Sequence, residues 1–239
     1  MRIGLVGYGK MGKEIEQIAL ERGHQIAWKV DRENPLKDQD TDVDMLIEFT
    51  RPEHAVGHIK WSLEKQLPIV VGTTGWNSYL SEVSKLAERL DGSLLHASNF
   101  SVGVNIFFRI NELLARLMTS HTNYRASIEE IHHTEKIDAP SGTAISLANG
   151  ILSNNENYLS WVCGENEIPH VNDQQLGVTA YRVPNVPGTH KVEYKSAIDT
   201  IEIKHEAHSR KGFALGAVLA AEWLQGKKGV YTMRDVLKD

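Results

Sequence analysis

Short apolar runs alternate with amphipathic stretches along the first half of the chain. The apolar runs RIGLV, QIAWKVD, DMLIEFT, LPIVVG and GSLLHAS predict five buried strands. Apolar residues recur at helical spacing in between, which predicts a helix after the first strand and further helices over about 53–66, 76–90 and 102–118. Strands and helices in this alternation are typical of a parallel sheet covered on both faces.

The pattern changes near Tyr124. RASIEEIHH predicts a strand, residues 140–152 predict a helix, and strands with hairpin-like turns follow over 178–183, 190–196 and 200–207. The last apolar helix, FALGAVLAAEWLQG, is expected to pack back on the first domain. We therefore expect an α/β fold. A Rossmann-type parallel-sheet domain comprises residues 1–122 completed by 211–239, and a smaller α+β domain with a mixed sheet comprises residues 123–210.

Three glycines follow the first predicted strand in the spacing G-x-G-x-x-G. The first permits a tight turn, the second lets the backbone approach a pyrophosphate, and the third lets helix and strand pack closely. The helix N-terminus adds free N–H groups and a partial positive charge. A tight turn that binds nothing is the alternative. The loop residues predicted to contact a dinucleotide are Gly7, Tyr8, Gly9, Lys10, Met11 and Gly12.

Asp31 closes the second predicted strand, where an acidic residue can hold the adenosine ribose hydroxyls. Its charge disfavours a 2′-phosphate. The adjacent Arg32 could pair with such a phosphate or lie over the adenine, and Lys10 could contact either phosphate group. Both cations could equally be solvated surface residues. We expect NADH, NADPH or both as cofactor, with NADH serving at least as well.

Three further loops follow predicted strands of the same sheet. Ligands bind at the carboxyl ends of the strands in an open parallel sheet, where hydroxyls and amides can orient a nicotinamide and its ribose. Ordinary turn and capping chemistry is the alternative for each loop taken alone. The predicted contacts are Phe49, Thr50, Gly72, Thr73, Thr74, Ser98, Asn99, Phe100 and Ser101.

Composition narrows the class of protein. The 239 residues are 41% hydrophobic and 24% charged, as in ordinary globular proteins, and the formal net charge of -5 argues against nucleic acid or an anionic membrane as partner. We find no apolar run long enough for a membrane span and no signal-peptide pattern. Cys163 is the only cysteine, which excludes an intrachain disulfide and fits a cytoplasmic location.

The segment IHHTEKIDAPSGTA concentrates titratable bases beside a predicted helix N-terminus. In a strand that ends at His132 and His133 the two imidazoles point to opposite faces, so they should differ in role. Either can exchange protons near neutral pH. One core and one surface histidine is the plainer interpretation, and Lys136 could be a solvated loop lysine.

Pro140 suits the first turn of the helix that follows. Ser141, Gly142 and Thr143 would then carry N–H groups without partners in the helix. With the charge of Lys136, these groups would form an anion site that suits a small carboxylate. A negatively charged substrate protonated by a histidine would explain the whole segment.

The eleven histidines raise the question of a metal site. His205 and His208 are three residues apart, so in a strand they point to opposite faces and chelate poorly. No cluster of cysteines supports zinc. We expect no metal.

The segment EIHHTEKIDAPSGTA, Glu130–Ala144, resembles the signature of the dihydrodipicolinate reductases throughout. The resemblance continues in EFTRPE, VVGTTG, SNFSVGVN and MRDVL, and so spans nearly the whole chain. It implies NADH- or NADPH-dependent reduction of 4-hydroxy-tetrahydrodipicolinate, a cyclic dicarboxylate, in lysine and diaminopimelate biosynthesis. It also implies a homotetramer built through the second sheet.

The resemblance also implies roles for individual residues. His132 resembles the general acid of the family, and Lys136 resembles its partner in substrate binding and proton donation. His133 resembles a substrate contact, while Gly142 and Thr143 resemble the pair that grips a carboxylate. The glycine loop is one residue shorter than the usual family form. The segment before Asp44 and the turn VPNVPGTH are also short, which leaves cofactor preference and substrate-loop details open.

Two alternatives differ in the chemistry they require. Another small-acid dehydrogenase of the same architecture would need no His-His-x-x-Lys beside Ser-Gly-Thr. A non-catalytic dinucleotide sensor would keep the glycine loop without a proton donor. The glycine loop and the segment Glu130–Thr143 lie on different predicted domains. We therefore expect closure of a cleft when cofactor and a dicarboxylate are both bound.

Overall fold

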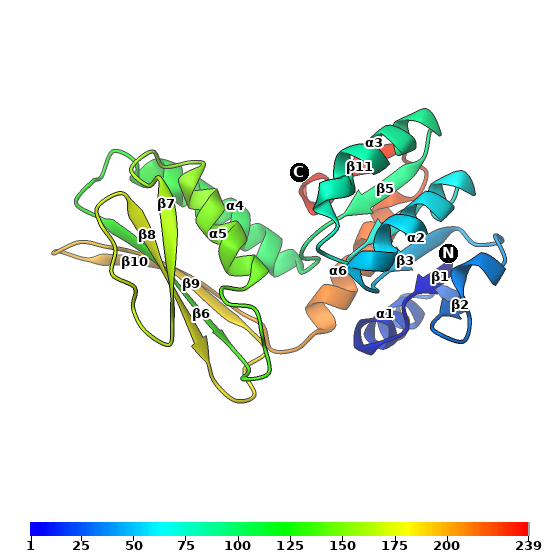
Figure 1. Cartoon of the computed structure of the whole chain (residues 1–239), viewed down its shortest axis with the longest axis horizontal. Coiled ribbons are helices and arrows are strands. Elements are labelled where there is room, and N and C mark those ends of the chain that lie inside the picture. The colour runs from blue at the N-terminus through cyan, green and yellow to red at the C-terminus, as the bar shows by residue number, and fades with distance from the viewer. Residues whose placement is uncertain (239) are drawn as a thin grey trace. The chain divides into compact units, whose positions relative to one another are not determined.

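The computed structural model describes residues 1–238 and divides into two compact units. Unit 1 comprises Met1–Val102 and the segment from Arg210 onward, and unit 2 comprises Gly103–Ser209 (Figure 1). The chain therefore leaves unit 1 once and returns to it. The boundary expected near residue 122 falls after the long helix α4, Val102–Met118, whereas the contacts group nearly all of α4 with unit 2.

Unit 1 is built on a six-stranded sheet in the order β11-β5-β4-β3-β1-β2, in which every neighbouring pair is parallel. Its strands are short, apolar and almost fully buried at the centre, which is what burial on both faces requires. The strands are β1 Arg2–Val6, β2 Gln25–Val30, β3 Met45–Glu48, β4 Ile69–Val71, β5 Ser93–His96 and β11 Gly229–Tyr231.

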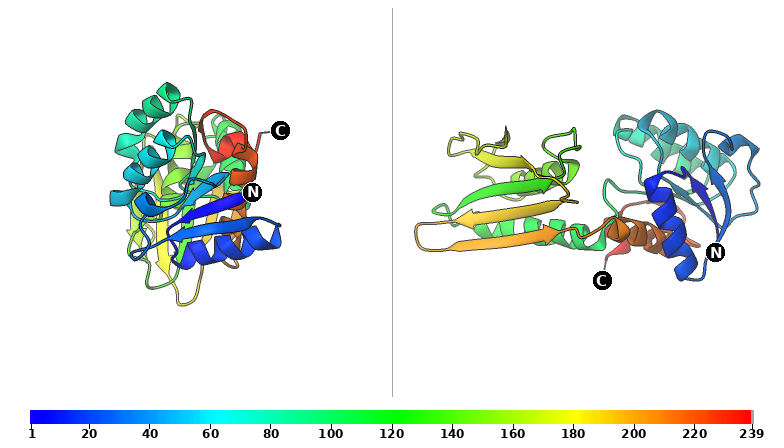
Figure 2. Two further views of the ribbon diagram at one scale, coloured as in Figure 1. Left: turned by 90° about the vertical axis from the view of Figure 1, so that its right-hand side faces the viewer. Right: turned by 90° about the horizontal axis from the view of Figure 1, so that it is seen from below.

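Helices cover both faces of this sheet (Figure 2). On one face α1, Lys10–Glu21, and α6, Lys211–Leu224, pack on side chains such as Leu5 and Ile47. On the other face α2, Pro52–Glu64, and α3, Leu80–Arg89, pack on side chains such as Leu46. Short helices η1 Leu36–Asp38, η2 Asn77–Tyr79 and α7 Met233–Val236 complete the unit.

The strand order reverses at β1, because β2 and β3 flank it on opposite sides. The loops that leave β1 and β3 therefore turn toward helices on opposite faces of the sheet. This switch point is where open α/β sheets bind ligands.

Unit 2 contains a five-stranded mixed sheet in the order β10-β9-β6-β8-β7. The central strand β6 is antiparallel to β9 and parallel to β8. Helices α4 and α5 cover one face of the sheet, where their apolar side chains join one core (Figure 2). The elements are β6 Arg125–His132, α5 Gly142–Leu152, β7 Ser160–Glu165, β8 Gln175–Arg182, β9 Thr189–Lys195 and β10 Thr200–Glu206.

The structure confirms the expected fold class, a Rossmann-type parallel sheet and a second mixed sheet. It also confirms that the C-terminal apolar helix, α6, packs in the first unit. Strands β7 and β11 were not predicted, since each is short and lacks a clear alternation. One helix start was wrong: α5 begins at Gly142, and Pro140 precedes its cap. Among residues 1–238 no helix is both long and apolar enough to cross a membrane.

Candidate active site

The glycine loop lies between β1 and α1 at the switch point. Gly7 has φ +101°, and a Cβ atom there would lie 2.1 Å from the carbonyl oxygen of Phe49. A Cβ atom on Gly12 would lie 2.3 Å from the carbonyl oxygen of Gly7. Two of the three glycines are therefore required by the fold itself, one by its backbone angle and both by close packing.

Gly9 differs from the other two glycines. A Cβ atom there would meet nothing within 4 Å, so the fold alone does not require glycine at this position. Gly9 is also the N-cap of α1, and no side chain caps the helix. The N–H groups of the first turn lack partners within the helix by geometry and carry a partial positive charge. This loop therefore fits a pyrophosphate: its approach is open and its donors are uncapped.

Tyr8 of the glycine loop contacts two charged residues, Glu16 on α1 and Lys29 on β2. Its hydroxyl donates a hydrogen bond to Glu16, and the Lys29 ammonium lies 3.2 Å from that hydroxyl and 4.4 Å from the ring centroid. Lys29 and Glu16 also form an ion pair at 2.6 Å, which lowers the pKa of Glu16 and raises that of Lys29. Lys10 is exposed, and Met11 packs at the edge of the core.

The loops after β3 and β4 are tied to each other. The backbone N–H of Thr50 donates to Thr73 Oγ1 at 2.7 Å, and Trp76 Nε1 donates to the carbonyl oxygen of Thr73 at 2.7 Å. Gly72 is required by packing, since a Cβ atom there would lie 2.1 Å from the Phe49 ring. Thr74 is exposed beside them. Five predicted contacts thus sit together at the carboxyl ends of adjacent strands.

The loop after β5 joins the same region of unit 1. The ring of Phe100 lies 5.7 Å from that of Phe49, centroid to centroid. The backbone N–H of Ser101 donates to Asn99 Oδ1 at 2.9 Å, which folds the loop on itself. Ser98 is exposed at its edge. Phe100 itself is buried, so its side chain supports the loop and offers no exposed surface to a ligand.

Asp31 and Arg32 lie exposed at the end of β2. Asp31 Oδ1 accepts hydrogen bonds from the backbone N–H groups of Asn34 and Glu33, at 3.0 and 2.9 Å. These bonds lower the pKa of Asp31, so the carboxylate stays ionised at neutral pH. Both of these bonds end on Oδ1.

The site in unit 2 is centred on Glu130, which is completely buried. The backbone N–H of Ser141 donates to both carboxylate oxygens, at 3.0 and 3.1 Å, and the guanidinium of Arg182 lies 3.4 Å from Oε1. Burial raises the pKa of this carboxyl, but its interactions with His132, His190 and Ser141 outweigh burial and lower it strongly. The carboxylate is therefore ionised throughout the neutral range.

Strand register explains how these groups meet. Glu130 and His132 are two residues apart on β6, so both point to the helix-covered face. Glu130 pairs with His190 of β9 across the antiparallel ladder, and His132 pairs with Arg182 of β8 across the parallel one. His132 Nδ1 lies 3.3 Å and His190 Nε2 lies 3.5 Å from Glu130 Oε2.

His133 and Lys136 follow the end of β6. Both side chains are half-buried, and Lys136 Nζ donates to the two oxygens of Asp138 at 2.7 and 2.8 Å. Burial raises the pKa of Asp138, but the hydrogen bond with Lys136 outweighs burial, so the pKa is lowered overall. Lys136 is thus paired with an exposed carboxylate, which an incoming anion can replace.

The start of α5 corrects part of the predicted anion site. Ser141 is the N-cap, and its N–H is committed to Glu130 rather than left for a ligand. Its Oγ accepts from the N–H of Ala144 at 3.2 Å and lies 3.0 Å from His190 Nε2. Gly142 is exposed with open space where a Cβ atom would stand, and Thr143 is half-buried beside it. Gly142 is therefore the exposed residue at the start of α5.

Glu130, Arg182 and His190 were not singled out by the sequence as site residues. Ligand atoms of Glu130, His132 and His190 lie within 4.8 Å of one another, a donor set that zinc also uses. Here the carboxylate already has a guanidinium and a backbone N–H as partners, which favours an ionic network. His205 is not part of this cluster. It is half-buried on β10, and its ring centroid lies 6.2 Å from that of Phe107.

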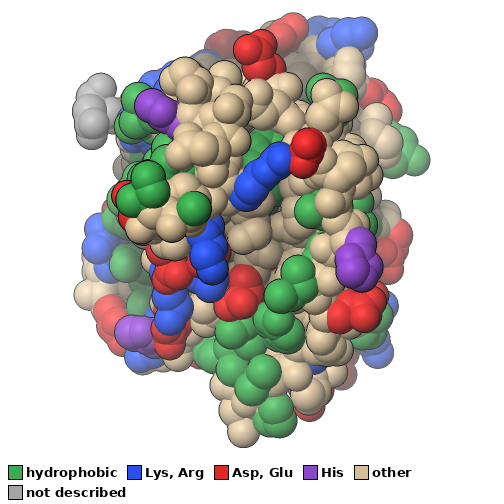
Figure 3. Space-filling view, turned by 90° about the vertical axis from the view of Figure 1, so that its left-hand side faces the viewer, with side chains coloured by type: hydrophobic (Ala, Val, Ile, Leu, Met, Phe, Trp, Pro, Cys, Tyr) green, Lys and Arg blue, Asp and Glu red, His purple; other side chains and the backbone are tan. Residues whose placement is uncertain are grey.

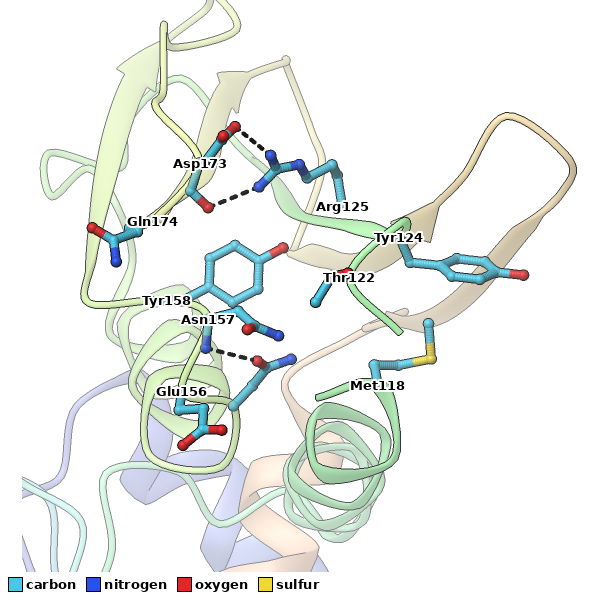
Figure 4. A pocket seen from close by; sticks show the side chains of 10 residues that line it. Met118, Thr122, Tyr124, Arg125, Glu156, Asn157, Tyr158, Asp173 and Gln174 are labelled. Atoms are coloured by element: carbon cyan, nitrogen blue, oxygen red, sulfur yellow. Dashed lines mark hydrogen bonds and ion pairs between the residues drawn. The ribbon is translucent and has the colours of Figure 1, made fainter. Parts of the chain in front are cut away.

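A separate hollow of about 310 Å³ lies in unit 2 at the beginning of β6 (Figure 4). The guanidinium of Arg125 reaches Asp173 across its mouth, and the Tyr158 hydroxyl accepts the N–H of Ala126 at 2.7 Å. Its polar groups therefore serve largely to join neighbouring segments.

On the face toward the viewer in Figure 3, basic and acidic side chains lie side by side and hydrophobic ones gather in the lower part. No broad field of one sign covers that face.

Comparison with known proteins gives one result along the whole chain. The family model "Dihydrodipicolinate reductase, N-terminus" matches residues 1–100, and "Dihydrodipicolinate reductase, C-terminus" matches residues 103–237. The fold and these matches define an NAD(P)H-dependent oxidoreductase of the Rossmann class. The chain belongs to the dihydrodipicolinate reductase family.

Individual relatives agree with this assignment. The 4-hydroxy-tetrahydrodipicolinate reductase of Christiangramia forsetii is 44% identical over 100% of this chain and 98% of its own length. The reductase of the same name from Clostridium novyi is 33% identical over 96% of this chain and 95% of its own.

Solved structures agree in fold. A dipicolinate-bound dihydrodipicolinate reductase from Paenisporosarcina sp. TG-14 has a TM-score of 0.76 at 21% identity, covering 99% of both chains. An amine dehydrogenase from Mycobacterium smegmatis has a TM-score of 0.66 at 10% identity, covering 100% of this chain and 96% of that one. At such identities the likeness concerns the fold alone.

Proposed function

We propose that this chain reduces 4-hydroxy-tetrahydrodipicolinate to tetrahydrodipicolinate in lysine and diaminopimelate biosynthesis. The observation that carries the proposal is the match of both family domains, in order, along the same chain. Bound NADH or NADPH supplies the hydride. The residues that fit the dinucleotide are the open loop around Gly9 with its uncapped helix, the hydroxyl-bearing loops after β3 and β4, and Asp31.

His132 delivers the proton in this proposal. Its Nδ1 faces the ionised Glu130, which leaves Nε2 as the atom that exchanges the proton. A Cβ atom on Gly188 would lie 3.0 Å from Nε2, so a larger residue at that position would crowd this nitrogen. A histidine that can donate and regain a proton near neutral pH suits general acid catalysis.

The two carboxylates of the substrate are bound by Lys136, His133, Gly142 and Thr143. Lys136 exchanges Asp138 for a substrate carboxylate, because both partners offer the same charge to its ammonium. Gly142 is exposed at the start of α5, and this end of the helix carries the positive end of the α5 dipole. Ser141 acts from behind, by holding Glu130 rather than the substrate.

A spectrophotometric assay tests the proposed reaction directly. Purified protein is mixed with NADH, then with substrate freshly formed from aspartate semialdehyde and pyruvate. We expect NADH oxidation that depends on both components. Binding of NADH without oxidation would favour a dinucleotide sensor, and oxidation only with other small acids would favour a different dehydrogenase.

The reductase assembles as a homotetramer through the second sheet in this proposal. Within residues 1–238, no helix of unit 2 covers the sheet face away from α4 and α5. This face carries a charge lattice in which Lys191 lies 3.7–3.9 Å from Glu129, Glu193 and Glu202. Such a face can pair with a copy of itself through complementary charges. Light scattering at micromolar concentration should give four times the chain mass of 26.8 kDa. A monomeric mass would contradict the proposal.

Cofactor and substrate binding are coupled through closure in this proposal, because the glycine loop and the segment Glu130–Thr143 belong to different units. Pyridine-2,6-dicarboxylate, a planar mimic of the substrate, should bind more tightly to NADH-loaded protein than to free protein. Calorimetric titration of both forms measures the coupling directly. Equal affinities would mean that the two sites act independently.

A further inference from the structure

The buried carboxylate of Glu130 is held from four directions. Ser141 at the α5 cap, Arg182 on β8, His190 on β9 and His132 on its own strand all contact it. Removing a carboxylate from water costs several kcal/mol unless partners offset the loss. Buried ionised groups with perturbed pKa values concentrate at functional sites. Glu130 lies 3.3 Å from Nδ1 of His132, which indicates that its charge acts on that imidazole.

The geometry around His132 favours one arrangement of its protons. Nδ1 and Oε2 of Glu130 are 3.3 Å apart, at ion-pair distance, although the two are not aligned as a hydrogen bond. A negative charge beside Nδ1 favours a proton on that nitrogen. After Nε2 gives up its proton, the same carboxylate keeps the ring in the Nδ1–H form, ready to be reprotonated at Nε2.

His190 supports this arrangement from β9. Its ring meets that of His132 edge-on, with centroids 5.0 Å apart and an interplanar angle of 70°. Its Nε2 lies 3.0 Å from Ser141 Oγ and 3.5 Å from Glu130 Oε2. Burial lowers the pKa of His190, so it is neutral at pH 7 and does not compete with His132 as a proton donor.

We propose that Glu130 and His190 are positioning residues for the proton donor: Glu130 holds the Nδ1 side of His132, and His190 holds both the carboxylate and the face of the ring. This rests on the proposed role of His132. The groups that face the imidazole are Glu130 from β6, Arg182 from β8 and His190 from β9. Arg182 fixes the second oxygen of the carboxylate, so that Oε2 remains directed at the two histidines.

Glu130→Gln tests the charge with little change of shape. We expect kcat to fall roughly 10- to 150-fold, the range for one interaction with a charged group, while KM and NADH affinity change little. The high-pH limb of the kcat profile should move to lower pH, because the protonated imidazole loses its counter-charge. Glu130→Asp should recover part of the lost rate. Glu156→Gln is the matched control, since Glu156 is exposed in the loop after α5 and lies outside both sites and the charge lattice on the sheet.

A double-mutant cycle separates this inference from the proposed function. If Glu130 acts through His132, Glu130→Gln should add no further loss of kcat in a His132→Gln background. Independent losses that multiply would overturn the inference, whereas a His132→Gln enzyme with parental kcat would overturn the proposed role of His132. His190→Gln provides a second variant should Glu130→Gln fold poorly. It should lower kcat and keep NADH affinity, and an unchanged kcat would count against its role.

Discussion

The two sites of this chain are built in opposite ways. In unit 1 the cofactor end of the sheet consists of glycines, an uncapped helix and hydroxyl side chains in loops. In unit 2 the site consists of ionised and titratable side chains that four separate elements bury together. A dinucleotide is gripped mainly through its phosphates, which backbone N–H groups can do. Proton delivery requires a particular nitrogen in a fixed setting, which only side chains can provide.

This contrast means that the two sites should fail differently when altered. A backbone site fails when a side chain is added, because there is no space for it. A side-chain site fails when a charge is removed, although its shape stays intact.

Gly7→Ala should produce the largest effect on unit 1. The new Cβ atom would lie 2.1 Å from the carbonyl oxygen of Phe49 at φ +101°, so strain and overpacking together should cost roughly 2–6 kcal/mol. Thermal unfolding and NADH titration by fluorescence should both show the loss. Gly57→Ala is the control, because Gly57 is helical with open space around it. Wild-type NADH affinity in Gly7→Ala would contradict this account of the loop.

Lys136→Ala should come next, through substrate binding. Loss of one charged contact with a carboxylate should raise KM roughly 10- to 150-fold. Lys136→Arg keeps the charge and should retain most of the affinity. Steady-state kinetics at saturating NADH measures both variants, and a KM equal to the wild-type value would show that Lys136 only pairs with Asp138.

Asp31→Ala should have a smaller effect, confined to cofactor choice. The ionised Asp31 repels a 2′-phosphate, so its removal should raise the NADPH-to-NADH ratio of kcat/KM severalfold. In the parent protein NADH should serve at least as well as NADPH. Arg32→Ala should move the ratio the other way. A parent with a large preference for NADPH would contradict this.

The smallest expected effect is a pH dependence of stability in unit 2. The pKa of buried His190 is lowered in the folded state, so the unfolded chain binds more protons once the pH falls below about 6.5. Glu130 shifts in the same direction below about 4.5. Stability should therefore fall as the pH falls, first from His190 and then from Glu130. Urea midpoints between pH 7.5 and 5 should show a shallower decline in His190→Gln, and parallel declines would refute it.

The fold was largely predictable because its signals are local. Strand runs and helical spacing are written in consecutive residues, so β1 to β5 and the helices between them follow from the pattern. Strands β7 and β11 were missed because pairing in the sheet, rather than local alternation, makes them strands.

The sites differ in the same respect. The glycine loop is a contiguous spacing, and so is the segment from His132 to Thr143. Arg182 and His190 join that segment only through the register of β8 and β9, which sequence periodicity does not give. Ser141 was assigned to the substrate because helix geometry leaves its N–H without a partner in the helix. The buried Glu130 takes that N–H, which only tertiary structure reveals.

The central claim is that His132 delivers the proton in a reaction whose hydride comes from a separately held dinucleotide. His132→Gln should lower kcat about 10²–10⁴-fold, the contribution of general acid catalysis. NADH affinity, measured by fluorescence titration of the same preparation, should remain at the parent value because the glycine loop lies in the other unit. A folded His132→Gln protein with parental kcat would contradict the claim.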